Sequence, residues 1–229
     1  APTWGRLPAG WVALVGLGSP ARWTADRARA AYALLGEEAR RHRWRTLGIG
    51  LPPIVPGERA AREAEPGRRL LADPAEEAAA AVEGVAFGAY GGRPGSGHEP
   101  ELVLLLNAAG GDGPGGAAGP HLGEVAGRVA RRAARAAVVS EAVRMARDLT
   151  NEPPNVLTPA ALAHRVREAM PEPVSVRVLG VEEMERRGMG ALLAVARASA
   201  NPPRLVVLRY RGEHRGEGRG EDRGEDRDE

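Results

Sequence analysis

Residues 101–106 read Glu101-Leu102-Val103-Leu104-Leu105-Leu106, an apolar run without polar alternation. Such a run is typical of a strand that is covered on both faces. Apolar runs at 11–17 and 46–51 also predict strands. Between the runs, the stretches 24–45 and 73–90 have the apolar spacing of helices. Strands that alternate with helices indicate an α/β domain.

The region 121–149 predicts one long helix or two abutting helices. Its apolar residues share one face of such a helix, and they are Leu122, Val125, Val129, Ala133 and Ala136. Arg144 and Arg147 fall back on this apolar side, so we expect the helix to bend or to restart near Ser140.

The remainder of the chain carries clear helix and strand signals. Thr158 can cap a helix whose first residue is Pro159 and which ends near Met170. The other expected elements are strands at 174–179 and 205–210, a short helix at 181–187, and loops at 52–69 and 91–100.

Composition shifts suggest the domain organisation. The glycine-rich stretch 107–120 is the best boundary, so we expect an N-terminal α/β domain over 1–120. A connecting helix and the opening of a second domain follow over 121–211. Residues 212–229 contain no apolar side chain and are expected to be a disordered tail.

The composition excludes several kinds of chemistry. All 32 basic residues are arginine, and the chain has no lysine and no cysteine. This excludes a Schiff base, a lysine-assisted phosphate loop, a thiol nucleophile, disulfides and a thiolate metal site. No apolar run approaches the ~20 residues that cross a bilayer, and no leader pattern opens the chain, so we expect a cytoplasmic protein without a membrane partner.

Two glycine patterns resemble nucleotide-binding loops. Gly16, Gly18 and Ala21 match G-x-G-x-x-A after a strand, the spacing of a dinucleotide-binding turn. Pro20 removes a backbone donor there, and no ribose-binding acid follows the 46–51 strand, so a tight turn is favoured. The stretch 110–119 lacks lysine and a following Ser or Thr, which favours a linker over an anion site.

An arginine stripe lies on the long helix, formed by Arg128, Arg131, Arg132 and Arg135. A stripe of this kind can follow the phosphates of a nucleic acid. No aromatic residues lie among these arginines to stack on bases, and solvated helix faces have the same pattern, so we favour a solvated face. A nucleic-acid or nucleotide-binding module is the second interpretation of the chain.

The five histidines form no recognisable site; they are His42, His98, His121, His164 and His214. None belongs to an H-x-x-x-H or H-E-x-x-H pattern, and the sequence has no G-x-S-x-G elbow. From the residues alone we therefore predict no catalytic, cofactor-binding or metal-binding residue in this chain.

A more specific signal is the stretch Ala146-Arg147-Asp148-Leu149-Thr150-Asn151-Glu152-Pro153-Pro154-Asn155, which continues through Thr158 to Ala163. It resembles the segment that opens the catalytic domain of leucyl aminopeptidases, the cytosol aminopeptidases of metallopeptidase family M17. The blocks 178–195 and 199–212 agree with this family at the right distance, and 15–18 and 82–90 agree more weakly. The resemblance covers 11–211 and is tight over 146–211.

The local physics of these blocks is consistent with ordered structure. Two prolines between polar residues predict that 151–158 is a rigid extended crossing. Gly188 and Gly190 predict a tight passage between short helices. Relatives place glycine before the serine that is Ser199 here, whereas this chain has Ala198, whose Cβ would strain a turn of positive φ.

The resemblance implies a fold and an activity. The implied fold is an N-terminal macro-domain-like mixed sheet flanked by helices, followed by the incomplete start of an α/β aminopeptidase catalytic domain. The implied activity is the release of N-terminal amino acids, preferentially leucine, from peptides. Two divalent ions, Mn or Zn, would activate water in the complete enzyme, which is expected to be a cytoplasmic homo-hexamer.

The resemblance also implies where the chemistry resides. The family's metal ligands lie in motifs of the type G-K-G-x-x-F-D and N-T-D-A-E-G-R, downstream of the block that ends at Gly212. This chain contains neither motif and no lysine. We therefore expect a fragmentary or frame-disrupted form that is inactive alone and binds no metal. A third interpretation is an inactive subunit that joins full-length relatives.

Overall fold

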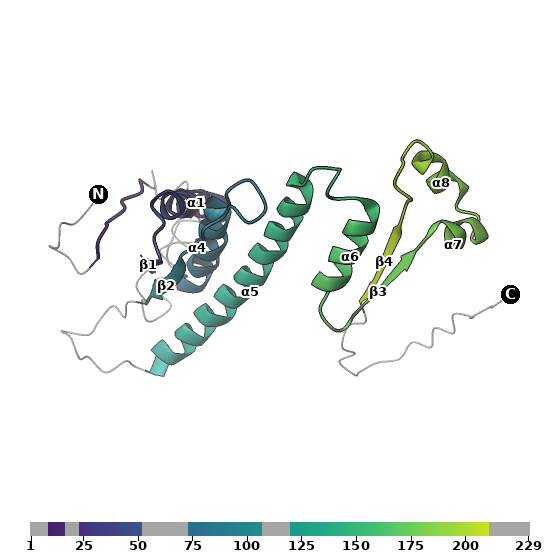
Figure 1. Cartoon of the computed structure of the whole chain (residues 1–229). Helices are drawn as coiled ribbons and strands as arrows, with labels where there is room; N and C mark the ends of the chain where they lie inside the picture. Colours follow the sequence, from purple (N-terminus) through teal and green to yellow (C-terminus); the bar gives the residue numbers. More distant parts are fainter. Residues whose placement is uncertain (1–8, 17–22, 52–72, 107–119, 211–229) are drawn as a thin grey trace, which may run out of the picture. The chain divides into compact units, whose positions relative to one another are not determined.

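The computed structural model describes residues 9–16, 23–51, 73–106 and 120–210 (Figure 1). The chain divides into two compact units, Ala1–Glu152 and Pro153–Glu229. The long helix that begins at residue 120 packs with the first unit. The division of the sequence into domains at 120 stays a prediction. Three predicted features lie outside the described residues. They are the boundary at 107–120 except for its last residue, the loop at 52–69 and the tail at 212–229.

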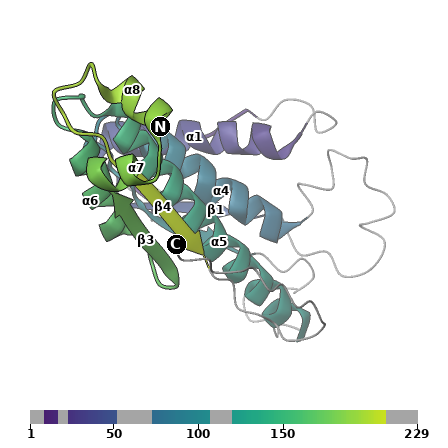
Figure 2. The same cartoon turned by 90° about the vertical axis from the view of Figure 1, so that its right-hand side faces the viewer.

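Among its described residues, the first unit contains three helices and a two-stranded sheet. Its elements are α1 (Ala25–His42), β1 (Thr46–Gly50), α4 (Pro74–Ala89), β2 (Glu101–Leu105) and α5 (Pro120–Asn151). The strands pair in parallel, from Thr46 opposite Glu101 to Gly50 opposite Leu105. Helix α4 contacts both α1 and α5 (Figure 2). The described elements confirm the predicted α/β class.

Capping residues begin these helices where the sequence predicts. The side chain of Thr24 accepts a hydrogen bond from the backbone N–H of Arg27, at 3.3 Å, and begins α1. The side chain of Asp73 accepts a hydrogen bond from the backbone N–H of Ala75 and begins α4, which has Pro74 in its first turn. Helix α1 ends earlier than expected, at His42, because Arg43 adopts a left-handed conformation with φ of 52°.

Glycines let α1 and α4 approach backbone to backbone. A Cβ added at Gly88 would lie 1.8 Å from the carbonyl oxygen of Ala33, and one at Gly84 would lie 2.5 Å from that of Arg29. On α1, a Cβ at Gly36 would lie 2.2 Å from the carbonyl oxygen of Val85. The spacing of the two helices therefore depends on glycine at these three positions.

The core lies between the helices and one face of the sheet. Leu47 and Ile49 of β1 pack on Ala81 and Val85 of α4, whereas their neighbours in β1 are exposed. The expectation that β2 is covered on both faces is wrong, since Leu105 is 55% exposed. The described helices pack against the face that carries Leu102 and Leu104, which leaves the other face of β2 uncovered by described residues.

Helix α5 buries its predicted apolar face. Val129 and Ala136 are among its buried residues, and Val129 packs with Ala75 and Ala78 of α4. The expected restart near Ser140 is wrong, because α5 is one helix from Pro120 to Asn151. Two arginines lie on this side of α5, and both have partners in the first unit. Arg144 pairs with Glu99, and Arg147 lies over the rings of Phe87 and Tyr90.

The predicted strand at 11–17 is not confirmed for the residues that the structure describes. Trp11 forms only an isolated bridge, and residues 12–16 are not in a strand. Leu14 is almost fully exposed. A strand needs a neighbouring edge for its backbone hydrogen bonds, so apolar composition alone did not determine this segment.

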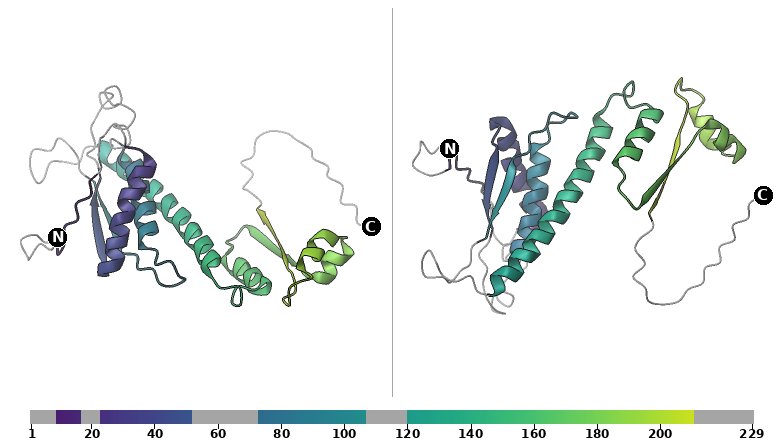
Figure 3. Two further views of the ribbon diagram at one scale, coloured as in Figure 1. Left: turned by 90° about the horizontal axis from the view of Figure 1, so that it is seen from above. Right: turned by 60° about the horizontal axis from the view of Figure 1, so that its bottom comes forward.

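The second unit contains a strand pair and three short helices (Figure 3). Its elements are α6 (Pro159–Ala169), β3 (Val174–Leu179), α7 (Val181–Arg186), α8 (Gly190–Ala196) and β4 (Leu205–Tyr210). The strands are antiparallel, with Val174 opposite Tyr210 and Leu179 opposite Leu205. The predicted elements of this half are confirmed, and α8 is the second of the short helices that the sequence predicts on either side of Gly188 and Gly190.

Candidate functional site

The stretch with the strongest sequence signal begins at the end of α5. The guanidinium of Arg147 lies over the rings of Phe87 and Tyr90, at 4.8 and 5.5 Å from their centroids. The hydroxyl of Tyr90 donates to Asp148 at 2.9 Å and accepts from the side-chain amide of Asn151 at 3.1 Å. These contacts join the ends of α4 and α5, so Arg147 has a structural role that explains its place on the buried side.

The link to the second unit is a turn rather than an extended crossing. The carbonyl of Pro153 accepts from the N–H groups of Val156 and Leu157, both at 2.9 Å. The two prolines therefore favour a turn, which their fixed φ permits. Thr158 then caps α6 by accepting from the N–H of Ala161 at 3.3 Å, as predicted.

Glu183 ties α7 to β3. Its carboxylate accepts hydrogen bonds from Arg177 at 2.8 Å, from Arg186 at 2.6 Å and from Arg187 at 2.9 Å. The hydrogen bond from Arg187 lowers the pKa of Glu183, and the charges of Arg186 and Arg177 act in the same direction. A carboxylate held ionised by three arginines has the role of an anchor rather than of a general acid.

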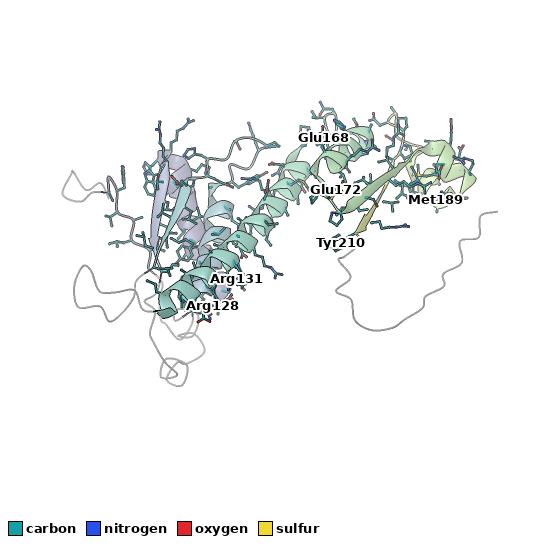
Figure 4. The ribbon with its side chains drawn as sticks, turned by 90° about the horizontal axis from the view of Figure 1, so that it is seen from below. Arg128, Arg131, Glu168, Glu172, Met189 and Tyr210 are labelled. Atoms are coloured by element: carbon teal, nitrogen blue, oxygen red, sulfur yellow. The ribbon has the colours of Figure 1, made fainter. Side chains whose placement is uncertain are left out.

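The passage between α7 and α8 follows the glycine prediction in part. Gly188 has a φ of 68°, which favours glycine, and Met189 follows it with its N–H bonded to the carbonyl of Met184 at 3.0 Å. Met189 lines a hollow of about 430 Å³ with Leu193 and Arg197 (Figure 4). Among the described non-glycine residues only Arg43 has positive φ, so the strain considered at Ala198 does not occur.

The arginine stripe of α5 is divided between two environments. Arg128 and Arg132 pair with acids at the start of α4: Arg128 lies 2.8 Å from Asp73, and Arg132 lies 2.5 Å from Glu76. Arg131 and Arg135 are exposed (Figure 4). Half of the stripe therefore holds α5 on α4, which favours the structural interpretation over phosphate binding.

Each of the histidines whose side chain is described has a contact in the structure. His42 stacks on Trp44, with ring centroids 5.7 Å apart, and His98 lies 2.9 Å from the carbonyl oxygen of Trp44. His164 lies 3.3 Å from Glu168 on the same helix. The described residues do not include the side chain of His121 or any part of His214. They also exclude most of the two glycine patterns, at 18–21 and at 110–119.

The described residues do not fit a metal centre. Within 9–16, 23–51, 73–106 and 120–210, no three His, Asp or Glu side chains lie together in a way that would hold an ion. A two-metal site needs several such ligands at fixed positions. In the same part of the chain, no helix is long and apolar enough to span a membrane.

Glu77 is a buried acid that the sequence analysis missed. It is 2% exposed, and its Oε1 accepts from the hydroxyl of Tyr32 at 2.6 Å. Its Oε2 has no hydrogen-bond partner among the described residues. Burial raises the pKa of Glu77, while the Tyr32 hydroxyl and the nearby Trp23 indole oppose this shift. The sequence contained a signal for the burial of Glu77, because this residue lies on the same face of α4 as Ala81 and Val85, which are buried.

Replacing Glu77 with glutamine is expected to change how the stability of the first unit depends on pH. Because the pKa is raised on folding, the contribution of Glu77 is fully present below its ordinary pKa and is lost as pH rises through the folded value. The free energy of unfolding of the parent should therefore fall relative to E77Q, by up to about 1.4 kcal/mol per pH unit in that window.

Urea unfolding from pH 4.5 upward can measure this difference by fluorescence, since all four tryptophans precede residue 152. The difference between the two proteins cancels the titration of the other carboxylates. Curves that stay parallel across the pH range would show that Glu77 does not bind a proton on folding.

The chain is similar to aminopeptidases in three respects. A family model described as "Cytosol aminopeptidase family, catalytic domain" matches residues 144–220. A probable cytosol aminopeptidase of Geotalea uraniireducens is 35% identical over 217 residues, which are 92% of this chain and 38% of that protein. One from Syntrophotalea carbinolica is 53% identical over 75 residues, which are 32% of this chain and 15% of that protein.

Solved structures give the same result. A tomato leucine aminopeptidase variant matches 89% of this chain and 36% of its own, with a TM-score of 0.62 and 25% identity. The bottromycin maturation enzyme BotP in complex with Mn matches 87% of this chain and 36% of its own, with a TM-score of 0.60 and 29% identity.

The fold is thus that of part of an α/β aminopeptidase. These matches confirm the predicted resemblance of the chain to the cytosol aminopeptidase family, peptidase family M17. The chain spans 38% of the length of the Geotalea relative and smaller shares of the others named here.

Proposed function

We propose that this chain serves peptide hydrolysis as the scaffold portion of a cytosol aminopeptidase. The observation that carries the proposal is the match of 92% of the chain to the Geotalea relative, because it covers both units rather than one motif. On this proposal, the residues that bind metal and activate water lie outside these 229 residues.

The finer features of the activity are part of the same proposal. They are metal dependence on two Mn or Zn ions, a preference for N-terminal leucine, assembly as a homo-hexamer and a cytoplasmic location. The Mn complex of BotP and the leucine aminopeptidase of tomato support the first two. The cytoplasmic location is supported by the names of relatives of this chain, which are called cytosol aminopeptidases.

The contacts of the family blocks support a scaffold role. Arg147 and Asp148 bind the end of α4, and Glu183 binds arginines on β3 and at the end of α7. These side chains hold elements in place. The described part of the chain contributes packing rather than a reacting group.

An assay of the isolated chain tests this division of roles. The purified 229-residue chain is expected to release no product from leucine p-nitroanilide above the metal blank, with Mn or with Zn. The complete Geotalea uraniireducens relative is the positive control. Turnover that rises in proportion to the concentration of the chain, and that EDTA abolishes, would show that these residues contain a catalytic centre.

A further inference from the structure

A groove in the first unit lies between α4, β2 and α5. Its volume is about 470 Å³, within the range of roughly 300–1,000 Å³ that holds small ligands. Its walls are aliphatic, and they include Val82 and Val85 of α4, Leu102 and Leu104 of β2, and Ala133 and Ala137 of α5.

The groove has an apolar end and a charged end. Leu104 packs in the cluster that contains Val129, whereas Glu99 pairs with Arg144, so α5 runs in the opposite direction to β2. The charged end carries Glu99, Glu141 and Arg144. Arg144 donates to Glu99 at 2.5 Å through one nitrogen, and its side chain is 42% exposed, so a ligand can reach the remainder of its guanidinium.

Ser140 lines the groove near this charged end. It is only 7% exposed, and its hydroxyl has no hydrogen-bond partner among the described residues. Buried hydroxyls are nearly always satisfied, since leaving one unpaired costs about 1–3 kcal/mol. A polar group of a ligand in the groove would satisfy this hydroxyl.

We propose that the groove binds a free aliphatic α-amino acid. Its carboxylate would bind Arg144 and the Ser140 hydroxyl, its ammonium group would bind the carboxylate of Glu141, and its side chain would lie on Val82 and Leu102. An alkylamine would leave the arginine unused, and a fatty acid would approach two carboxylates without a compensating ammonium group. The proposal does not rest on peptidase activity, because the groove belongs wholly to the first unit.

Calorimetric titration of the purified chain tests this assignment. L-leucine is expected to bind saturably, and 4-methylpentanoate and isoamylamine, which each lack one charged group, should bind at least tenfold more weakly. The absence of saturable leucine binding at millimolar concentration would overturn the proposal. Equal binding of either analogue would overturn it as well.

Variants place the binding in the groove. R144Q should weaken leucine binding at least tenfold, and A137L, which fills the groove from α5, should abolish it. S140A removes a buried hydroxyl without a partner, so it should fold normally and bind leucine several-fold more weakly. The matched control is R131Q, which replaces an exposed arginine of the same helix that does not line the groove. This variant should bind leucine as strongly as the parent does.

Circular dichroism is recorded for each variant before titration, and only folded variants are compared. Leucine binding of parental strength in folded S140A and R144Q would contradict the assignment. This outcome is independent of the aminopeptidase proposal, which concerns turnover and not ligand binding by the isolated chain.

Discussion

Replacing Gly88 with alanine is expected to abolish the folding of the first unit. The new Cβ would lie 1.8 Å from the carbonyl oxygen of Ala33 and 2.8 Å from the backbone nitrogen of Glu37. Both atoms belong to the backbone of α1, so no side-chain rotation relieves the overlap. Overpacking with side chains costs about 1–3 kcal/mol, and a backbone overlap should exceed the upper end of that range. Tryptophan fluorescence in a urea titration measures the loss.

Gly123 on α5 provides the matched control. A Cβ added there meets nothing within 4 Å, so G123A should raise stability by up to about 1 kcal/mol through helix propensity. If G88A unfolds at the same urea concentration as the parent, α1 and α4 do not pack through their glycines.

The local elements could be predicted because their signals are local. Thr158 precedes a helix with the expected side-chain cap, and Thr24 and Asp73 cap their helices in the same way. The strands at 46–50, 101–105, 174–179 and 205–210 follow from short apolar runs between turn residues.

Features that depend on distant partners could not be predicted in this way. The place of Arg147 on the apolar side of α5 predicted a break in the helix, and it is explained by the rings of Phe87 and Tyr90. The segment 11–16 has a strand's composition, yet Trp11 forms only an isolated bridge and residues 12–16 are not in a strand. The close crossing of α1 and α4 requires glycine at three positions on two helices that are separated in the sequence.

The candidate site shows the same limit. Resemblance identified the blocks at 146–163 and 178–195, and the comparisons confirm the family. The roles of their charged residues depend on contacts with β3 and α4, which spacing does not reveal. The groove that Ser140 lines is formed by three separate elements, α4, β2 and α5, so the periodicity within any one of them gave no indication of it.

Joining residues 1–210 to the part of the Geotalea uraniireducens relative beyond its aligned region is expected to yield a metal-dependent aminopeptidase. The scaffold of this chain would then position the metal ligands that the relative supplies. Turnover of leucine p-nitroanilide should exceed that of the isolated chain by at least about a thousandfold, because metal-activated water accounts for most of the rate.

The same fusion with G88A is the control for the scaffold, since it retains every catalytic residue and alters only the α1–α4 crossing. It should lose activity together with the folded signal of the first unit. A fusion whose activity does not depend on this crossing would show that the first unit is dispensable.

The most direct measurement is therefore kcat/KM of the folded fusion for leucine p-nitroanilide, with and without Mn. The account predicts Mn-dependent turnover that EDTA abolishes and that the isolated 229-residue chain lacks. A folded fusion without turnover, under conditions in which the complete Geotalea protein is active, would contradict it.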